Sequence, residues 1–295
     1  MTSAGRFAPS PSGELHVGNL RTAMLAWLFA RSTGRKFLLR VEDLDRARAG
    51  AEEVQLRDLQ AVGVTWDGDV VRQTDREPLY SAAIGRLSAA GLAYECFCTR
   101  REIQEAPSAP HAPQGAYPGT CRNLTDVERQ ERRAVRPAAI RLRADVSELT
   151  VTDALHGDFT GVVDDFVLRR NDGVAAYNLA VVVDDAEQGI DQVVRGDDLL
   201  PSTPRQAYLA SLLGYPVPEY AHVPLVLNAD GARLAKRDGA VTLADLSREG
   251  HSAADVAAWV LASLGLPGTL DSALAAFDPA ELPREPWIWQ GMPGR

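Results

Sequence analysis

Two short segments, far apart in the chain, carry side chains that could hold a run of phosphates. His16 and Gly18 lie where an apolar strand gives way to a helix, within the stretch APSPSGELHVGN at residues 8–19. A helix N-terminus attracts anions, and a histidine there can donate a hydrogen bond to a phosphate oxygen. Arg233 and Lys236 follow a second apolar strand, where cations on a loop could reach the same phosphates. Either segment alone also fits a capped helix start or a solvated loop, so only the pair points to phosphate chemistry.

The cysteines form a second candidate site. Cys96, Cys98 and Cys121 fall within 26 residues of one another. An odd, clustered set in a chain without a signal peptide indicates a metal site rather than a disulfide framework, because thiolates are good ligands for Zn²⁺. The competing interpretation is three buried free cysteines, which are common in protein cores.

The elements that would position these residues alternate between strand and helix. Apolar runs predict strands at residues 5–8 and 36–41, and helical spacing predicts helices at 18–34, 51–62 and 77–90. This order predicts an α/β fold with a parallel, doubly wound sheet. The same reasoning predicts later strands at 139–144, 149–152, 177–183, 193–195 and 222–227, helices at 203–213, 242–249 and 252–264, and a loose arm at 279–295.

The alternation breaks between about residues 93 and 165, where prolines and then arginines dominate. We interpret this region as an insertion into the sheet domain. The predicted organisation is a sheet domain in two halves, an insertion with a candidate zinc site, and a short helical C-terminal segment. The ranges are 1–92 and 166–240 for the two halves, 93–165 for the insertion and 241–295 for the C-terminal segment.

Composition and charge limit the functions that fit. Of the 295 residues, 45% are hydrophobic and 24% are charged, which is ordinary for a globular protein with a core. The first residues contain no apolar stretch typical of a signal peptide, and nowhere do about 18 apolar residues run together as a membrane span requires. We therefore expect a cytoplasmic enzyme. The net charge of −9 disfavours non-specific nucleic-acid binding by the whole surface, although a local basic patch is compatible with it.

Taken together, the two phosphate segments resemble the HIGH and KMSKS elements of class I aminoacyl-tRNA synthetases. Four further stretches resemble the catalytic domain of glutamyl-tRNA synthetases: RFAPSPSG at 6–13, RVEDLD at 40–45, RGDDLL at 195–200 and STPRQ at 202–206. The resemblance covers roughly residues 5–250. It implies a Rossmann-like catalytic domain that activates L-glutamate with ATP and Mg²⁺.

The resemblance also implies a role for each matching residue. The implied glutamate site is Arg6, Ala8, Ser10, Glu42, Tyr177 and Arg195. The implied ATP site is His16, Gly18, Asn19, Arg233 and Lys236, of which His16, Gly18 and Lys236 are the catalytic set. Arginine can grip a carboxylate with two hydrogen bonds, so a glutamine side chain would leave a guanidinium unpaired at a cost of about 2–5 kcal/mol. One departure from the family is Ala235, which replaces the serine of the second motif.

The length of the chain favours a shortened branch of this family. Full glutamyl-tRNA synthetases continue into a helical anticodon-binding region, whereas only 45 residues follow Gly250 here. The architecture is similar to that of glutamyl-Q tRNA(Asp) synthetases, which transfer glutamate to the queuosine base in the anticodon loop of tRNA(Asp). This similarity implies that loop as the partner, no anticodon-binding domain, and activation without tRNA. It further implies one structural Zn²⁺ held by the three cysteines and Tyr117, with His111 as a rival ligand.

The insertion also carries a group of arginines with two interpretations. They could bind RNA phosphates, but Glu128 and Glu131 lie among them, so an ion-paired helix face fits as well. The group is Arg129, Arg132, Arg133, Arg136, Arg141 and Arg143.

Two other functions stay open: a truncated glutamyl-tRNA synthetase that charges the 3′-terminal adenosine, and a non-catalytic RNA-binding paralogue.

Overall fold

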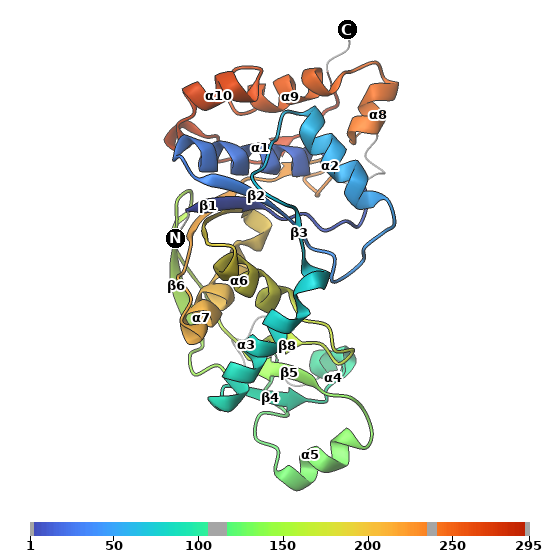
Figure 1. The fold of residues 1–295 in the computed structure, drawn as a ribbon, viewed down its shortest axis with the longest axis vertical. Coiled ribbons are helices and arrows are strands. Elements are labelled where there is room, and N and C mark those ends of the chain that lie inside the picture. Colours follow the sequence, from blue (N-terminus) through green and yellow to red (C-terminus); the bar gives the residue numbers. More distant parts are fainter. Residues whose placement is uncertain (1–2, 106–116, 235–240, 293–295) are drawn as a thin grey trace.

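The structure, a computed structural model, describes residues 3–105, 117–234 and 241–292. A large mixed sheet lies at the centre of the elongated molecule, and a small three-stranded sheet lies towards one end (Figure 1). His111 and Lys236, which the sequence places in the metal and ATP sites, lie outside the described residues. No helix in the described ranges is long and apolar enough to cross a membrane.

The large sheet has the strand order β3-β2-β1-β9-β10-β6-β7. Its neighbours pair in parallel from β3 through to β6, and the hairpin β6–β7 is antiparallel. From β3 to β10 the strand order is that of a doubly wound sheet, in which the order of the strands along the chain reverses between β1 and β9. Ligands bind outside the carboxyl ends of the strands at such a point. The bounds are β1 (Ala4–Phe7), β2 (Lys36–Val41), β3 (Val71–Arg72), β6 (Glu148–Asp153), β7 (Gly157–Val162), β9 (Ile190–Gly196) and β10 (Glu219–Val223).

Helices cover both faces of this sheet (Figure 1). On one face, α1 (Val17–Ser32) lies between the sheet and the helices α9 (Ala253–Ala262) and α10 (Leu270–Ala276), and shares one apolar cluster with them. Because α1 is enclosed on most sides, apolar residues occupy nearly its whole circumference. The same part of the fold contains α2 (Ala51–Ala61) and α8 (Leu243–Arg248). A second cluster packs α3 (Glu77–Ala89), α6 (Tyr177–Glu187) and α7 (Thr203–Leu213) together.

A separate part of the molecule, called here the small-sheet region, lies beyond α3. It consists of the antiparallel strands β4 (Ala93–Cys96), β5 (Ala139–Leu142) and β8 (Val167–Arg169) and the helices α4 (Arg100–Glu105) and α5 (Asp126–Arg133). Strand pairing crosses the predicted limits of the insertion: β6 and β7 join the large sheet, and β8, from beyond residue 165, joins the small one. The division at residues 93 and 165 therefore stays a prediction that describes the chain only approximately.

Two expectations from the sequence are wrong. Residues 177–183, predicted as a strand because of three successive valines, form the first part of helix α6. Its residues from Leu179 to Asp185 are all buried, so a continuous apolar run marks a helix enclosed on several sides here, which periodicity alone cannot distinguish from a buried strand. The tail is not a loose arm either, because β12 (Trp287–Ile288) pairs in parallel with β11 (Val226–Leu227) and Trp289 is buried.

Candidate functional site

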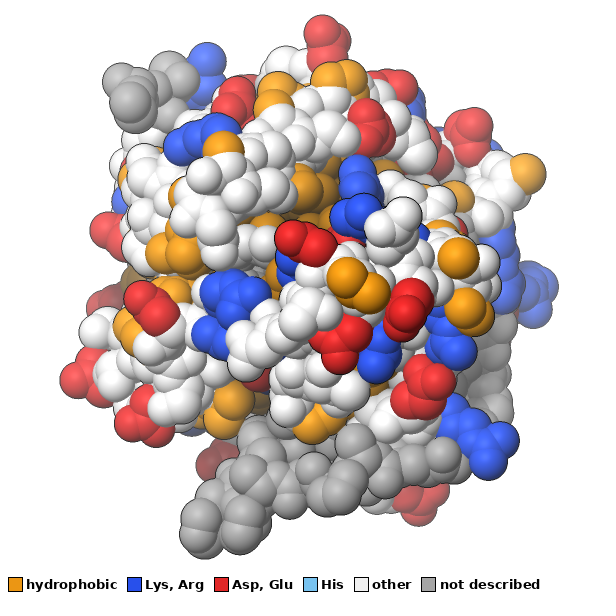
Figure 2. Space-filling model, turned by 90° about the horizontal axis from the view of Figure 1, so that it is seen from below, with side chains coloured by type: hydrophobic (Ala, Val, Ile, Leu, Met, Phe, Trp, Pro, Cys, Tyr) orange, Lys and Arg blue, Asp and Glu red, His pale blue; other side chains and the backbone are white. Residues whose placement is uncertain are grey.

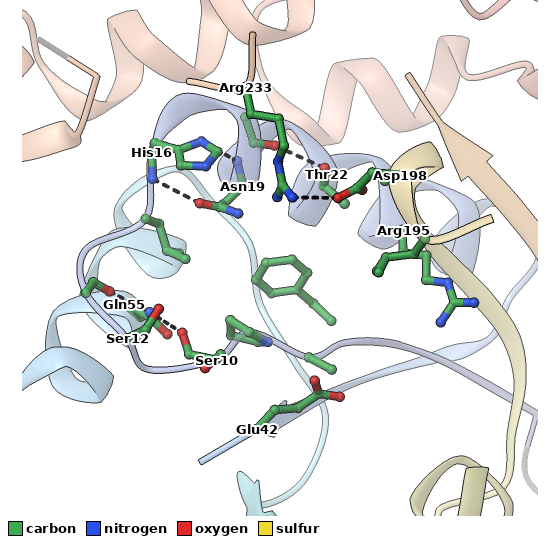
Figure 3. A pocket seen from close by; sticks show the side chains of 18 of the residues that line it. Ser10, Ser12, His16, Asn19, Thr22, Glu42, Gln55, Arg195, Asp198 and Arg233 are labelled. Carbon is green, nitrogen blue, oxygen red and sulfur yellow. Dashed lines mark hydrogen bonds and ion pairs between the residues drawn. The ribbon is translucent and has the colours of Figure 1, made fainter. Parts of the chain in front are cut away.

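One cavity of about 670 Å³ opens at the carboxyl ends of β1 and β9, where the sheet order reverses. Every residue predicted for the glutamate and ATP sites that lies within the described ranges lines this cavity. They are Arg6, Ala8, Ser10, His16, Gly18, Asn19, Glu42, Tyr177, Arg195 and Arg233. Figure 3 labels Ser10, His16, Asn19, Glu42, Arg195 and Arg233 among them. Segments from five places in the chain thus meet around one space. The loop from β1 to α1 is held by Gln55, whose amide donates to the carbonyl oxygens of Ser10 and Gly13 at 3.0 and 2.6 Å.

His16 caps helix α1 and presents one ring nitrogen to the cavity. Its Nδ1 accepts a hydrogen bond from the backbone N–H of Asn19 at 3.3 Å, and the Asn19 side chain accepts from the His16 backbone. With Nδ1 acting as an acceptor, the ring hydrogen must lie on Nε2. Burial, followed by the charge of Arg233, lowers the pKa of His16 to about 4. The residue is therefore a neutral hydrogen-bond donor near pH 7.

Gly18 leaves no room for a larger residue at the start of the helix. A Cβ placed there would lie 3.0 Å from the His16 ring and 3.3 Å from the Cβ of Val226. A side chain at this position would push the histidine out of its capping geometry and fill part of the cavity wall. The glycine thus keeps the backbone at the N-terminus of α1 open to an anionic ligand.

Arg233 lines the same end of the cavity as His16 but comes from a distant segment of the chain. It follows a turn at residues 228–231 and bridges back to Leu227 in β11. Its NH1 lies 2.7 Å from Oδ2 of Asp198, but 65% of the side chain is exposed. Exposed ion pairs of this kind contribute little stability, so the guanidinium can exchange Asp198 for another anion at small cost. Figure 3 shows Arg233 beside His16 and Asn19, with its guanidinium turned to Asp198.

The opposite end of the cavity rests on a buried charge network that the sequence analysis missed. Asp185, from α6, accepts hydrogen bonds from Nε of Arg6 at 3.1 Å and from NH1 of Arg40 at 2.7 Å. Arg40 is fully buried, and its NH2 also lies 3.5 Å from Oε1 of Glu42. Burial raises the pKa of Glu42 although the nearby arginines oppose this, so a cationic ligand group would find a carboxylate that lacks full compensation. A charged residue inside the apolar strand 36–41 was the available signal, because buried charges need partners.

Arg195 forms the second cationic wall of this end. It is 5% exposed, and its NH1 donates to the hydroxyl oxygen of Tyr177 at 3.3 Å. Because that oxygen accepts from a guanidinium, the hydroxyl hydrogen of Tyr177 is free to point elsewhere, including at a ligand carboxylate. Although 41% of Tyr177 is exposed, desolvation of its hydroxyl raises the pKa of Tyr177, so the hydroxyl stays protonated. The cavity thus combines a helix N-terminus, a neutral histidine and the cation Arg233 at one end with two arginines and a carboxylate at the other.

Comparison with known proteins agrees with this geometry. The family described as tRNA synthetases class I (E and Q), catalytic domain, matches residues 4–268. A glutamyl-Q tRNA(Asp) synthetase of Nocardia farcinica is 69% identical over 97% of this chain and 92% of its own length. The chain belongs to this synthetase family. A second member, from Cutibacterium acnes, is 54% identical over 91% of this chain and 78% of its own length.

Comparison with solved structures shows that the chain has the catalytic fold of class I synthetases. The crystal structure of a glutamate tRNA ligase from Elizabethkingia meningosepticum, described as a complex with its amino acid, superposes with a TM-score of 0.84 at 28% identity. The match covers 98% of this chain and 67% of the ligase. This match confirms the predicted α/β architecture of a class I synthetase for the chain. Its large sheet is mixed and largely parallel.

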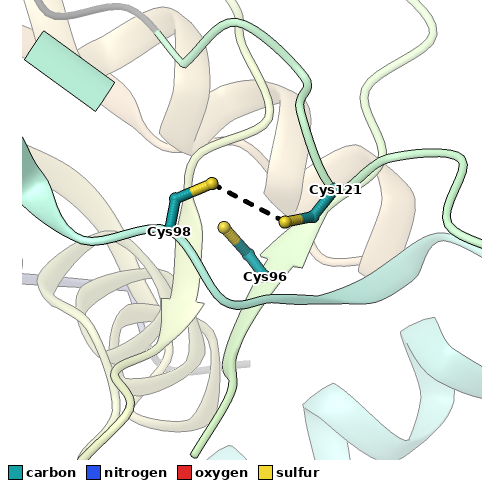
Figure 4. A group of neighbouring side chains, drawn as sticks. All are labelled: Cys96, Cys98 and Cys121. Carbon is teal, nitrogen blue, oxygen red and sulfur yellow. Dashed lines mark hydrogen bonds between the residues drawn. The ribbon is translucent and has the colours of Figure 1, made fainter. Parts of the chain in front are cut away.

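The three cysteines of this family member converge in the small-sheet region (Figure 4). Their sulfur atoms all lie within 4.8 Å of one another, and Sγ of Cys98 is 3.6 Å from Sγ of Cys121. Tetrahedral Zn²⁺ with bonds of about 2.3 Å would place two sulfur ligands about 3.8 Å apart. The hydroxyl oxygen of Tyr117 lies 3.3 Å from Sγ of Cys96 and 3.7 Å from that of Cys98, where a fourth ligand belongs. The residues present therefore fit one tetrahedral metal ion.

Most arginines of the small-sheet region have partners within the chain. Arg129 pairs with Asp126, Arg133 with Glu95 and Arg136 with Glu102. Arg141 is buried over the ring of Tyr117. Arg132 donates to Sγ of Cys121 at 3.9 Å, and Arg143 donates to Oδ1 of Asn123 at 3.3 Å. On the face nearest this region, acidic and basic side chains alternate rather than gather by sign (Figure 2). The structure thus favours the ion-paired interpretation over an uncompensated basic patch.

Proposed function

We propose that this chain forms glutamyl-adenylate from L-glutamate and ATP and transfers the glutamyl group to the queuosine base in the anticodon loop of tRNA(Asp). The single observation that supports this most is the shared cavity. Two residue sets, one suited to phosphates and one to a dicarboxylic amino acid, line opposite ends of it. The relatives that carry the glutamyl-Q tRNA(Asp) synthetase name add the choice of RNA.

Activation needs positioning more than acid–base chemistry. A glutamate carboxylate is already a nucleophile at neutral pH; its oxygen bonds to the α-phosphorus of MgATP while the bond to pyrophosphate breaks. In this proposal the N-terminus of α1 and the Nε2–H of His16 stabilise charge on the phosphate oxygens, and Arg233 follows the leaving phosphates. Lys236 shares that role as a sequence prediction. The acceptor on the RNA then attacks the carbonyl carbon of the adenylate, and AMP leaves.

The other end of the cavity selects the amino acid. Glu42 receives the substrate ammonium, and Arg6, Arg195 and Tyr177 receive the side-chain carboxylate. Ala8 and Ser10 place backbone and hydroxyl groups beside the substrate. A glutamine amide would turn N–H donors towards the arginines, which have no acceptor to offer, so it should bind less well.

The cysteine cluster is proposed to hold one structural Zn²⁺. Cys96, Cys98, Cys121 and Tyr117 would complete the coordination, and the ion would order a region whose apolar cluster is small. The cavity carries the chemistry alone, and the metal has no step in it.

One assay separates the three functions. The chain is supplied with ATP, labelled glutamate, and tRNA(Asp) with or without queuosine, some of it trimmed at the 3′ end. Label on trimmed RNA that contains queuosine supports the proposal. Label that requires an intact 3′ end would instead identify a truncated glutamyl-tRNA synthetase, and absent pyrophosphate exchange would identify a non-catalytic paralogue. His16→Asn is the matched control, because asparagine still caps the helix but lacks the Nε2–H donor.

A further inference from the structure

Side-chain hydrogen bonds to three other residues hold Arg195 in place at the cavity wall. Nε donates to Nε2 of His222 at 3.0 Å and NH2 donates to Oγ1 of Thr203 at 2.9 Å, in addition to the contact between NH1 and Tyr177. A guanidinium has five N–H donors. These three contacts leave one N–H on each terminal nitrogen, which is the pair that a carboxylate can accept together.

His222 lies behind Arg195 in the sheet. The two residues are register partners on the neighbouring parallel strands β10 and β9, so their side chains share one face. His222 has no exposed surface, and its Nδ1 lies 2.6 Å from Oδ2 of Asp153, which is equally buried. Asp153 ends strand β6 and also accepts from the backbone N–H groups of Leu155, His156 and His222. The carboxylate is thus anchored by the backbone before it touches the ring.

The direction of these hydrogen bonds fixes the state of the imidazole. Because guanidinium N–H groups can only donate, Nε2 of His222 must accept, and the ring hydrogen must lie on Nδ1, directed at Asp153. Burial lowers the pKa of His222, the bond to Asp153 opposes this, and the charge of Arg195 lowers the pKa further. Asp153, His222 and Arg195 therefore form a line of hydrogen bonds that ends at the cavity.

We propose that Asp153 and His222 are positioning residues that fix the plane of the Arg195 guanidinium and so set the preference for glutamate over glutamine. This inference rests on the proposed glutamate site. It adds two residues that neither contact the cavity nor belong to its lining. Without the acceptor at Nε2, the guanidinium could rotate, and its two remaining N–H groups would no longer face the ligand as a fixed pair.

The test compares variants of the full chain in ATP–pyrophosphate exchange. His222→Leu removes the acceptor; it should raise the KM for glutamate roughly tenfold to hundredfold, the range for losing a hydrogen bond to a charged group, and leave the KM for ATP unchanged. Discrimination against glutamine should fall with it. In His222→Gln the amide oxygen can still accept from Nε, so most of the loss should be recovered. His156→Gln, a neighbouring histidine that does not contact Arg195, is the matched control.

Three results would overturn the inference. One is a parallel rise in both KM values for His222→Leu; another is a lower melting temperature with both KM values unchanged; the third is no recovery in His222→Gln. Should His222→Leu fail to fold, Asp153→Asn replaces it. One oxygen then becomes a donating amide nitrogen, so either the backbone N–H groups at Oδ1 or the ring Nδ1–H at Oδ2 lose their acceptor, and the same split between the two KM values is expected.

The state of the ring tests the positioning separately from the proposed function. Nitrogen-15 NMR of the ligand-free chain should show His222 as the Nδ1–H tautomer at pH 7. A charged ring or the Nε2–H tautomer would contradict the inference even if glutamate were activated normally. Conversely, the chain could show the expected tautomer but no glutamate-dependent pyrophosphate exchange. That result would contradict the proposed function and leave the line of hydrogen bonds intact.

Discussion

The large sheet and the small-sheet region are stabilised by different forces. The sheet lies between two extensive apolar clusters, and α1 alone contributes ten buried residues to one of them. The small-sheet region has a small cluster of its own, built on Tyr94, Cys96, Phe97, Tyr117 and Cys121, while Leu142 of β5 and Leu168 of β8 join the second large cluster. Two of the five side chains in the small cluster are thiols that face the candidate metal site. Burial of apolar area dominates the first region, whereas the second depends on polar contacts and on whatever the thiols bind.

Charged groups follow the same division. Arg40, beneath the glutamate end of the cavity, is fully buried with Asp184, Asp185 and Glu42 around it. By contrast, 58% of the side chain of Arg133, which pairs with Glu95 on β4, is exposed. The difference teaches that the candidate cavity is built on buried charges already paired in the fold. We expect the small-sheet region to change without disturbing them.

Metal removal should break the comparison most visibly. Structural Zn²⁺ sites in small domains supply about 10–16 kcal/mol, far more than the small apolar cluster could replace. Chelation, or Cys121→Ser, should therefore abolish hydrogen-exchange protection in β4 and β5 while β1, β2 and β9 keep theirs, as measured by mass spectrometry. Glutamate-dependent pyrophosphate exchange should persist. Equal protection in both regions after the metal is gone would mean that the cysteines are ordinary core residues.

A matched pair of arginine substitutions should show the next largest contrast. Arg40→Met removes the buried cation that Asp184, Asp185 and Glu42 share, although Arg6 and Arg76 still pair with the two aspartates, and it should cost about 3–5 kcal/mol in the free energy of unfolding. Arg133→Met removes an exposed pair and should cost less than about 1 kcal/mol. Urea denaturation followed by tryptophan fluorescence measures both. Similar losses from the two variants would contradict the view that only the large sheet depends on buried charge.

The sequence analysis predicted the cavity because its residues stand in recognisable local stretches. Residues 6–19, 40–45 and 195–206 each carry a strand end or helix start together with its functional side chains. The predicted helix at 203–213 and strand at 36–41 have the same bounds in the structure, since capping residues and apolar runs are local signals too.

The supporting network could not be predicted in the same way. Arg6 and Asp185 are 179 residues apart, and Arg40 and Asp185 are 145 apart, so no spacing rule joins them. The incorrect strand at 177–183 made this harder, because it ended before Asp184 and Asp185 and so did not place them on the helix α6 that carries them. From this helix the two carboxylates reach Arg40 together.

Acidic pH should sharpen the comparison by acting on the large sheet. Folding holds the pKa of His16 at about 4, below its ordinary value of 6.5. As the pH falls from 6.5 towards 4, the unfolded chain takes up a proton that the folded chain refuses. The wild type should therefore lose up to about 1.4 kcal/mol per pH unit relative to His16→Asn, and nothing above pH 6.5. Urea titrations at pH 7 and pH 5.5 measure the difference, and an NMR pKa near 6.5 for His16 would refute it.

Helix capping offers the smallest and most local test. Ser252 and Thr125 each cap a helix through a reciprocal pair of hydrogen bonds, with Asp255 for α9 and with Glu128 for α5. Replacing either by alanine removes a bond worth about 1 kcal/mol to its own helix. The consequence should differ, because α9 buries four residues against the core and α5 buries none.

Ser252→Ala should therefore lower the global free energy of unfolding by about 1 kcal/mol, because α9 unfolds together with the sheet. Thr125→Ala should leave the urea midpoint in place and only speed amide exchange in α5. The chemistry of the two substitutions is nearly the same, so any difference reports how each helix is coupled to the core. A loss of global free energy of unfolding in Thr125→Ala would show that the small-sheet region unfolds together with the large sheet. The two regions would then differ in composition and not in stability.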